Sequence, residues 1–115
     1  MCYHVDAPKA EWLAEAEAEL AALARTEQLS IGRAAMKLEA LGSQLSFPHQ
    51  SAVRGNTGLR ELWAKSGWSA WRAFYRRIAP EVFKIGAVGP EYLVHRNAFA
   101  RSVRLAEERL SEFEE

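Results

Sequence analysis

The chain has 115 residues, of which 49% are hydrophobic and 26% charged, values typical of an ordinary globular protein. Its single cysteine, Cys2, excludes an internal disulfide bond and argues against a thiolate metal site, and no apolar run reaches membrane-spanning length. We therefore expect one domain over residues 1–115, located in the cytoplasm and without a membrane segment.

The net charge is zero, but the charges are distributed unevenly along the chain. Residues 1–50 hold four Lys/Arg against seven acids, residues 51–109 hold eleven against five, and residues 110–115 add three glutamates. A basic segment between acidic ones indicates a surface for a polyanion. An uneven scatter of charge in a neutral protein would give the same pattern, so both interpretations stay open at this point.

The first fifty residues predict two helices after a short strand at residues 3–5. Asp6 is expected to cap the first helix, with Pro8 in its first turn. Its apolar positions recur at helical spacing, at Leu13, Ala16, Leu20 and Leu23. Ser30 is expected to cap the second helix, which Gly42 ends. A short link would make the two helices an antiparallel pair.

The second half of the chain changes from a helical to a strand pattern and then back again. We expect strands over residues 59–65, 69–78 and 81–88, with turns at Ser66-Gly67 and Ala79-Pro80 and an end at Gly89-Pro90. Asn97 is expected to cap a final helix. The buried stripe of that helix consists of Phe99, Val103, Ala106, Leu110 and Phe113. The sequence therefore predicts an α+β domain: a helical hairpin, a mainly antiparallel sheet of three or four strands, and a C-terminal helix.

Arginines and aromatic residues are interleaved over residues 59–77, LRELWAKSGWSAWRAFYRR. Guanidinium groups pair with phosphates and aromatic rings stack on bases, so this composition indicates binding of single-stranded RNA. The alternative is a hairpin whose tryptophans belong to the core and whose arginines only solvate one face. The chain has no phosphate-binding glycine motif, and its three histidines lack metal-ligand spacing, so we expect neither a cofactor nor a metal.

Four short motifs follow one another within residues 8–112. They are LEALGSQLSFP (38–48), VRGNTGLRELW (53–63), WRAFYRR (71–77) and AFARSVRLAEERL (98–110). In their order and spacing they resemble the RelE/HigB-type toxins of bacterial type II toxin–antitoxin systems, in particular the branch of phage-derived toxin-like proteins.

The resemblance implies a compact sheet backed by two helices, and an enzyme that cleaves translated mRNA in the ribosomal A site. Such cleavage is an attack of the ribose 2′-OH on the adjacent phosphate, which needs a base, an acid and cations but no metal or cofactor. The resemblance also implies a cognate antitoxin, encoded by an adjacent gene and often carrying a helix-turn-helix. Arg72 matches the family's central-strand arginine and is assigned to phosphate or transition-state contact. Tyr75 is either a core residue or a hydrogen-bonding group near the RNA.

The chain departs from the family pattern in two places. Trp63 stands where the family usually has the second arginine of its Leu-x-Glu-Leu-Arg strand, and residues 87–99, AVGPEYLVHRNAF, lack the family's Phe-x-Lys-Lys segment. Arg60, His95 and Arg96 are candidates for the missing functions, histidine being the side chain that exchanges protons near neutral pH. We therefore predict a catalytic set of Arg72, Arg76, His95 and Tyr75. The predicted RNA-binding set consists of Arg60, Trp63, Lys65, Arg77, Arg96, Arg101 and Arg104.

Two other functions remain open besides the ribosome-dependent mRNA endonuclease. One is a ParE-like inhibitor of DNA gyrase, which would share the fold and act by binding a protein. The other is a catalytically degenerate toxin that serves only as an antitoxin-binding partner. Cut mRNA, gyrase-dependent DNA damage, or the absence of a growth effect would distinguish the three.

Overall fold

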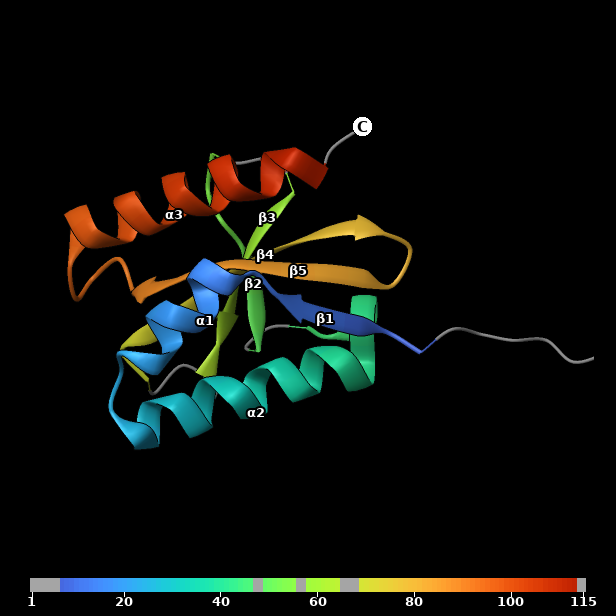
Figure 1. Ribbon diagram of the computed structural model, residues 1–115, viewed down its shortest axis with the longest axis horizontal. Coiled ribbons are helices and arrows are strands. Elements are labelled where there is room, and N and C mark those ends of the chain that lie inside the picture. Colours follow the sequence, from blue (N-terminus) through green and yellow to red (C-terminus); the bar gives the residue numbers. More distant parts are fainter. Residues whose placement is uncertain (1–6, 47–48, 56–57, 65–68, 114–115) are drawn as a thin grey trace, which may run out of the picture.

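The computed structural model describes residues 7–46, 49–55, 58–64 and 69–113. Within these residues lie three α-helices, two short 3-10 helices and five strands, and Figure 1 shows how the helices and strands are arranged. In order they are β1 (Lys9–Trp12), α1 (Ala14–Ala21), α2 (Arg25–Leu41), η1 (Gly42–Gln44), β2 (Gln50–Ala52), β3 (Leu59–Trp63), β4 (Trp71–Ala79), β5 (Val82–Pro90), α3 (Arg96–Leu110) and η3 (Ser111–Phe113).

The five strands form one sheet in the order β1-β5-β4-β3-β2. β2, β3, β4 and β5 pair antiparallel with their neighbours, whereas β1 lies parallel to β5 at the sheet edge. The predicted α+β class with a mainly antiparallel sheet is therefore confirmed, and the sheet has five strands. The predicted 3–5 strand and the Ser66-Gly67 turn lie outside the described residues.

The sheet separates two layers of helix, with α2 on one face and α3 on the other (Figure 1). Side chains alternate between the faces of a strand, so each strand contributes to both cores. On the α2 face, Ile31 and Leu38 pack against Leu62, Tyr75 and Ile85. The core of the α3 face is built from Val53, Leu59, Phe74, Ala87, Val103, Ala106 and Leu110.

The stripe predicted for the last helix is confirmed. Val103, Ala106 and Leu110 are buried, and Phe99 and Phe113 pack against the same core. The helix lies very close to β5, because a Cβ added at Gly86 would come within 2.8 Å of the Leu110 side chain. A residue with a side chain would therefore push α3 away from the sheet at this position.

The beginning of the first predicted helix is wrong. Residues 9–12 form β1, and α1 starts only at Ala14. An edge of β5 is available at Val82–Ile85, and pairing with it satisfies the backbone of β1 in parallel register. Pairing with β5, and not the local helical pattern, therefore decides the structure of residues 9–12. The sequence alone does not reveal that this edge of β5 is open to pairing.

Two predicted helix caps are also wrong. α2 begins at Arg25, and Ser30 lies inside it, where its hydroxyl donates to the Thr26 carbonyl at 2.9 Å. α3 is capped by His95 instead of Asn97, since Nδ1 of His95 accepts from the Ala98 N–H at 3.0 Å. The predicted end of α2 is confirmed, because Gly42 has φ 55° and a Cβ there would collide with Glu81 and Pro8.

β1 pairs with only the first part of β5, and side chains cover the following part of that edge. β1 ends at Trp12 opposite Ile85, and α1 then carries Glu19 along the edge. The Glu19 carboxylate accepts from the Val88 N–H at 3.0 Å, and Arg109 of α3 donates to the Gly86 carbonyl at 2.9 Å. Arg109 and Glu19 also pair with each other at 3.1 Å. These contacts satisfy backbone groups that an open edge would otherwise leave exposed.

Candidate functional site

β3 and β4 carry most of the predicted site residues, and their register divides these residues between the two faces. Trp63 lies opposite Arg72 and Arg60 lies opposite Tyr75. Since directly opposed residues share a face and successive residues alternate, Trp63 and Arg72 lie on the α3 face, whereas Arg60 and Tyr75 lie on the α2 face. Arg77 lies on the same side of β4 as Tyr75. The predicted site is thus two separate regions.

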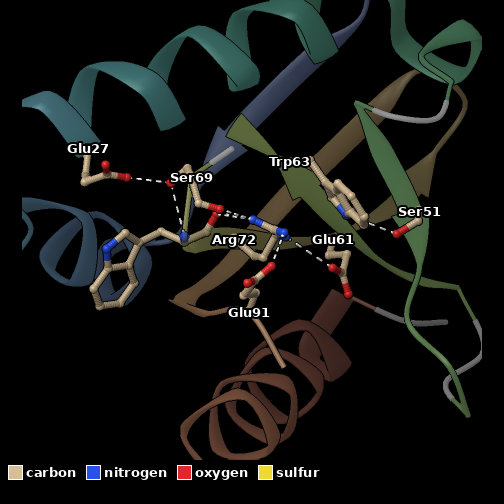
Figure 2. Close-up of polar contacts among 8 residues, drawn as sticks. Glu27, Ser51, Glu61, Trp63, Ser69, Arg72 and Glu91 are labelled. Carbon is tan, nitrogen blue, oxygen red and sulfur yellow. Dashed lines mark hydrogen bonds and ion pairs between the residues drawn. The ribbon is translucent and has the colours of Figure 1, made fainter. Parts of the chain in front are cut away.

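The first region is centred on Arg72, whose residue is only 2% exposed. Its guanidinium donates to the Ser69 carbonyl at 2.6 Å and to the Glu91 carboxylate at 2.6 Å. Its Nε lies 3.4 Å from the Glu61 carboxylate, and its central carbon lies 4.6 Å from the centre of the Trp63 ring. Figure 2 shows Arg72 between the two glutamates, with Trp63 beside it. We call Arg72, Glu61, Glu91 and Trp63 the Arg72 cluster.

The Arg72 cluster is anchored at its sides by further polar contacts. The Ser69 hydroxyl donates to Glu27 at the beginning of α2 at 2.5 Å, and the Trp71 N–H donates to that same hydroxyl at 3.1 Å (Figure 2). On the other side, the Trp63 indole N–H donates to the Ser51 hydroxyl at 3.1 Å. The cluster therefore connects β3 and β4 to α2 and to the edge strand β2.

The charges within the cluster do not balance. One guanidinium faces two carboxylates, and the side chains of Glu61 and Glu91 are 14% and 28% exposed. Burial raises the pKa of Glu61 above its ordinary value of 4.5, and the neighbouring Glu91 adds to the rise, while the Arg72 charge opposes it. A carboxylate whose pKa is raised toward neutrality, beside a fixed cation, is suited to accept a proton during acid–base chemistry.

Sequence reasoning missed both glutamates of the cluster. Glu61 is two residues before Trp63, so alternation alone places it on the same face, but only the β3–β4 register shows that this face also holds Arg72. Glu91 lies beyond the end of β5 and reaches Arg72 through the fold. No local pattern could have indicated that contact.

The second region is a pocket of about 370 Å³ on the α2 face, beyond the C-terminal end of α2. Its lining residues are Gly42, Ser43, Leu45, Gln50, Gly58, Arg60, Tyr75, Arg77 and Phe83. Burial raises the pKa of Tyr75 to about 12, although the nearby Arg60 charge opposes the rise. The Tyr75 ring packs edge-on against Phe83 at 5.9 Å. Tyr75 is therefore a core residue whose hydroxyl stays protonated at neutral pH.

The remaining predicted residues are spread around α3 and the end of β4. Arg76 lies on the same face of β4 as Arg72 and Phe74, as alternation predicts. Arg96 stacks on Tyr92 at 5.3 Å, and Arg101 and Arg104 are exposed on α3. No hydrogen bond or ion pair of the described residues joins His95 to Arg72. Lys65 lies outside the described part of the chain.

The four residues predicted as catalytic are therefore not brought to one place. Arg72 and Arg76 share the α3 face, Tyr75 belongs to the opposite face, and His95 is exposed at the start of α3. Their chemical roles stay predictions. Within the described residues, no group of three or more His, Cys, Asp or Glu side chains could hold a metal ion. No described helix is both long and apolar enough to cross a membrane.

No family model matches the sequence, and no curated protein matches it either. Two solved structures match the fold. One is the Escherichia coli toxin RelE with two arginines replaced by alanine, in the free state: TM-score 0.61, 15% identity, covering 86% of this chain and 97% of that one. The other is the isolated E. coli RelE toxin: TM-score 0.55, 19% identity, covering 83% of this chain and 98% of that one. The chain therefore has a RelE-like toxin fold.

Proposed function

We propose that this protein is the toxin of a type II toxin–antitoxin system and that it cleaves mRNA on the ribosome in the cytoplasm. The RelE-like fold, which extends over most of the chain, supports the toxin class. The observation that carries the proposed chemistry is the pairing of Arg72 with a carboxylate of raised pKa, Glu61, in the middle of the sheet.

In this proposal the ribose 2′-oxygen attacks the adjacent phosphorus while its proton passes to Glu61. Arg72 stabilises the charge that develops on the phosphorane oxygens. The bond from phosphorus to the 5′-oxygen then breaks, and the departing oxygen takes a proton from water. The products are a 2′,3′-cyclic phosphate and a free 5′-hydroxyl, and the proposed steps use neither a metal nor a cofactor.

The substrate phosphate must compete with Glu91 for Arg72. Glu91 holds the guanidinium at 2.6 Å, and it is the more exposed of the two carboxylates. We propose that the phosphate displaces Glu91, while Glu61 stays beside Arg72 as the base. Replacing Glu91 with glutamine removes the competing charge and should increase cleavage.

The burial of Arg72 favours a second candidate function. Arg72 is 2% exposed and faces two carboxylates, as expected of an arginine whose role is to stabilise the fold. In that case the protein would bind an antitoxin without cutting RNA. The basic segment at residues 51–109 would then be a docking surface for an acidic partner.

Expression of the protein alone in bacteria, followed by mapping of mRNA 5′ ends, tests both proposals. We expect growth arrest and cut mRNA with the unmodified protein, loss of cutting with Glu61→Gln, and increased cutting with Glu91→Gln. Glu39→Gln, which alters an exposed acid of α2, is the matched control. Cutting that persists in Glu61→Gln would contradict the assigned base. No cutting by any variant, together with a complex that co-purifies with the product of the adjacent gene, would support the second candidate.

A further inference from the structure

The pocket beyond α2 differs from the Arg72 cluster in its charge. Among the described residues that line it, the charged ones are Arg60 and Arg77, both exposed at the surface. Glu81 is not among the lining residues, but its carboxylate lies at the edge of the pocket, where it accepts from the Ser43 hydroxyl at 2.6 Å and from the Ser43 N–H at 3.3 Å. The lining that the described residues form therefore carries two cations, and Glu81 at its edge is held by Ser43.

The two arginines are placed so that both can reach one ligand. Arg60 lies opposite Tyr75 on the neighbouring strand, and Arg77 is the next residue of β4 on the same face. Diagonal neighbours on a sheet lie roughly 7–8 Å apart, within reach of two long side chains. The Gln50 side-chain oxygen accepts from Arg60 at 2.9 Å and fixes its orientation. A guanidinium has about five N–H donors, so Arg60 keeps others for a ligand.

The other walls of the pocket suit an ester of phosphate. Tyr75 contributes a hydroxyl whose pKa of about 12 keeps it protonated, so it adds no negative charge that would repel an anion. Leu45 and Phe83 supply apolar surface on the same side. The volume of about 370 Å³ lies within the range of small-molecule sites, about 300–1,000 Å³.

We propose that this pocket binds a phosphate monoester of nucleotide size. Arg60 and Arg77 would hold the phosphate through charge-assisted and forked hydrogen bonds, and the apolar wall would contact the rest of the ligand. The phosphate can belong to a free nucleotide or to the 5′ end of an RNA strand. The pocket lies on the opposite face of the sheet from Arg72, so binding there does not depend on RNA cleavage.

Calorimetric titration of the full chain tests the proposal with four probes: AMP, adenosine, inorganic phosphate and a 5′-phosphorylated RNA tetranucleotide. We expect saturable binding of AMP, weaker binding of inorganic phosphate and none of adenosine. Equal affinity for AMP and the tetranucleotide would show that a free nucleotide is enough for binding and that the rest of an RNA strand adds no contact. Clearly tighter binding of the tetranucleotide would assign an RNA end.

Arg77→Gln and Arg60→Gln should each weaken AMP binding about tenfold or more, because each removes one charged contact. Arg60→Lys keeps the charge but loses the forked geometry and should also weaken it. Arg25→Gln removes an arginine at the start of α2 and serves as the matched control with unchanged affinity. The proposal is overturned if AMP does not bind, if Arg60→Gln and Arg77→Gln bind AMP as the unmodified protein does, or if an acidic peptide binds the pocket and AMP does not. Melting curves for each variant show that a loss of binding does not come from unfolding.

Discussion

Arg72 and Arg77 lie five residues apart on the same strand, but their surroundings differ completely. Arg72 is buried on the α3 face between two carboxylates, whereas Arg77 is exposed on the α2 face beside a pocket that has no acid among its described lining residues. Both count equally toward the basic character of residues 51–109. The comparison shows that the charge of a segment does not say which of its cations can meet a ligand, because strand alternation and burial decide that.

The difference in burial also predicts that replacing Arg72 and replacing Arg77 will change the free energy of unfolding by different amounts. A buried ion pair contributes little when it is compared with a well-packed apolar core, but removal of one partner leaves the other charge buried and unpaired. An exposed arginine leaves nothing unpaired when it is removed.

Arg72→Met should destabilise the protein by about 3–5 kcal/mol, because it leaves Glu61 and Glu91 without their cation. Urea unfolding measures the loss. Arg72→Met combined with Glu61→Gln should recover part of it, since one of the two orphaned charges is then absent. A loss below about 1 kcal/mol for Arg72→Met would mean that the cluster does not hold the sheet together.

Trp63→Leu should cost about 2 kcal/mol, because it removes the ring that faces the Arg72 guanidinium and the hydrogen bond to Ser51. Trp63→Phe keeps an aromatic face and loses only the hydrogen bond, so we expect about 1 kcal/mol. Thermal or urea unfolding of the two variants separates the contributions. Equal losses in both would show that the stacking on Arg72 adds nothing.

Glu61 should make stability depend on pH in a defined direction. Its pKa in the folded protein is raised above 4.5, so between 4.5 and the raised value the unfolded chain loses a proton that the folded chain retains. The contribution of Glu61 to the free energy of unfolding therefore falls as the pH rises through this window. Glu61→Gln removes that dependence, so the stability of the unmodified protein relative to Glu61→Gln should decrease from pH 4 to neutrality. An increase over the same range would reverse the inferred direction of the pKa shift.

Arg77→Ala should change the free energy of unfolding by less than about 0.5 kcal/mol, as is usual for an exposed residue without a buried partner. The same urea titration used for Arg72→Met measures it, so the two arginines are compared directly. A loss comparable to that of Arg72→Met would remove the distinction between the two faces.

The helices illustrate how far local patterns reach. The stripe from Phe99 to Phe113 recurs at helical spacing, and the structure buries it as predicted. The end of α2 at Gly42 follows from the freedom of glycine at positive φ. By contrast, β1 and β2 were missed because short edge strands are stabilised by the neighbour with which they pair, and Lys9–Trp12 carries no strong strand pattern of its own.

The candidate site was predictable only in part. The sequence indicated Arg72 as the central arginine, and alternation placed Arg76 beside it on the same face. It did not indicate Glu91, which is 19 residues from Arg72 along the chain and meets it only after β5 has folded against β4. The pocket was likewise not predictable, because it joins residues just beyond the end of α2 to residues of four strands.

The sequence by itself determined the composition of the basic segment, the order of the main helices and strands, and the buried face of the last helix, since all of these depend on residues close together in the chain. The tertiary structure decided which arginines are neutralised and which are open. The β3–β4 register places the Trp63 indole opposite Arg72, and the fold brings two carboxylates to the same guanidinium. Arg77 lies beside a pocket whose described lining residues include no acid. Electrostatic surroundings are set by contacts between distant segments, and no local pattern contains them.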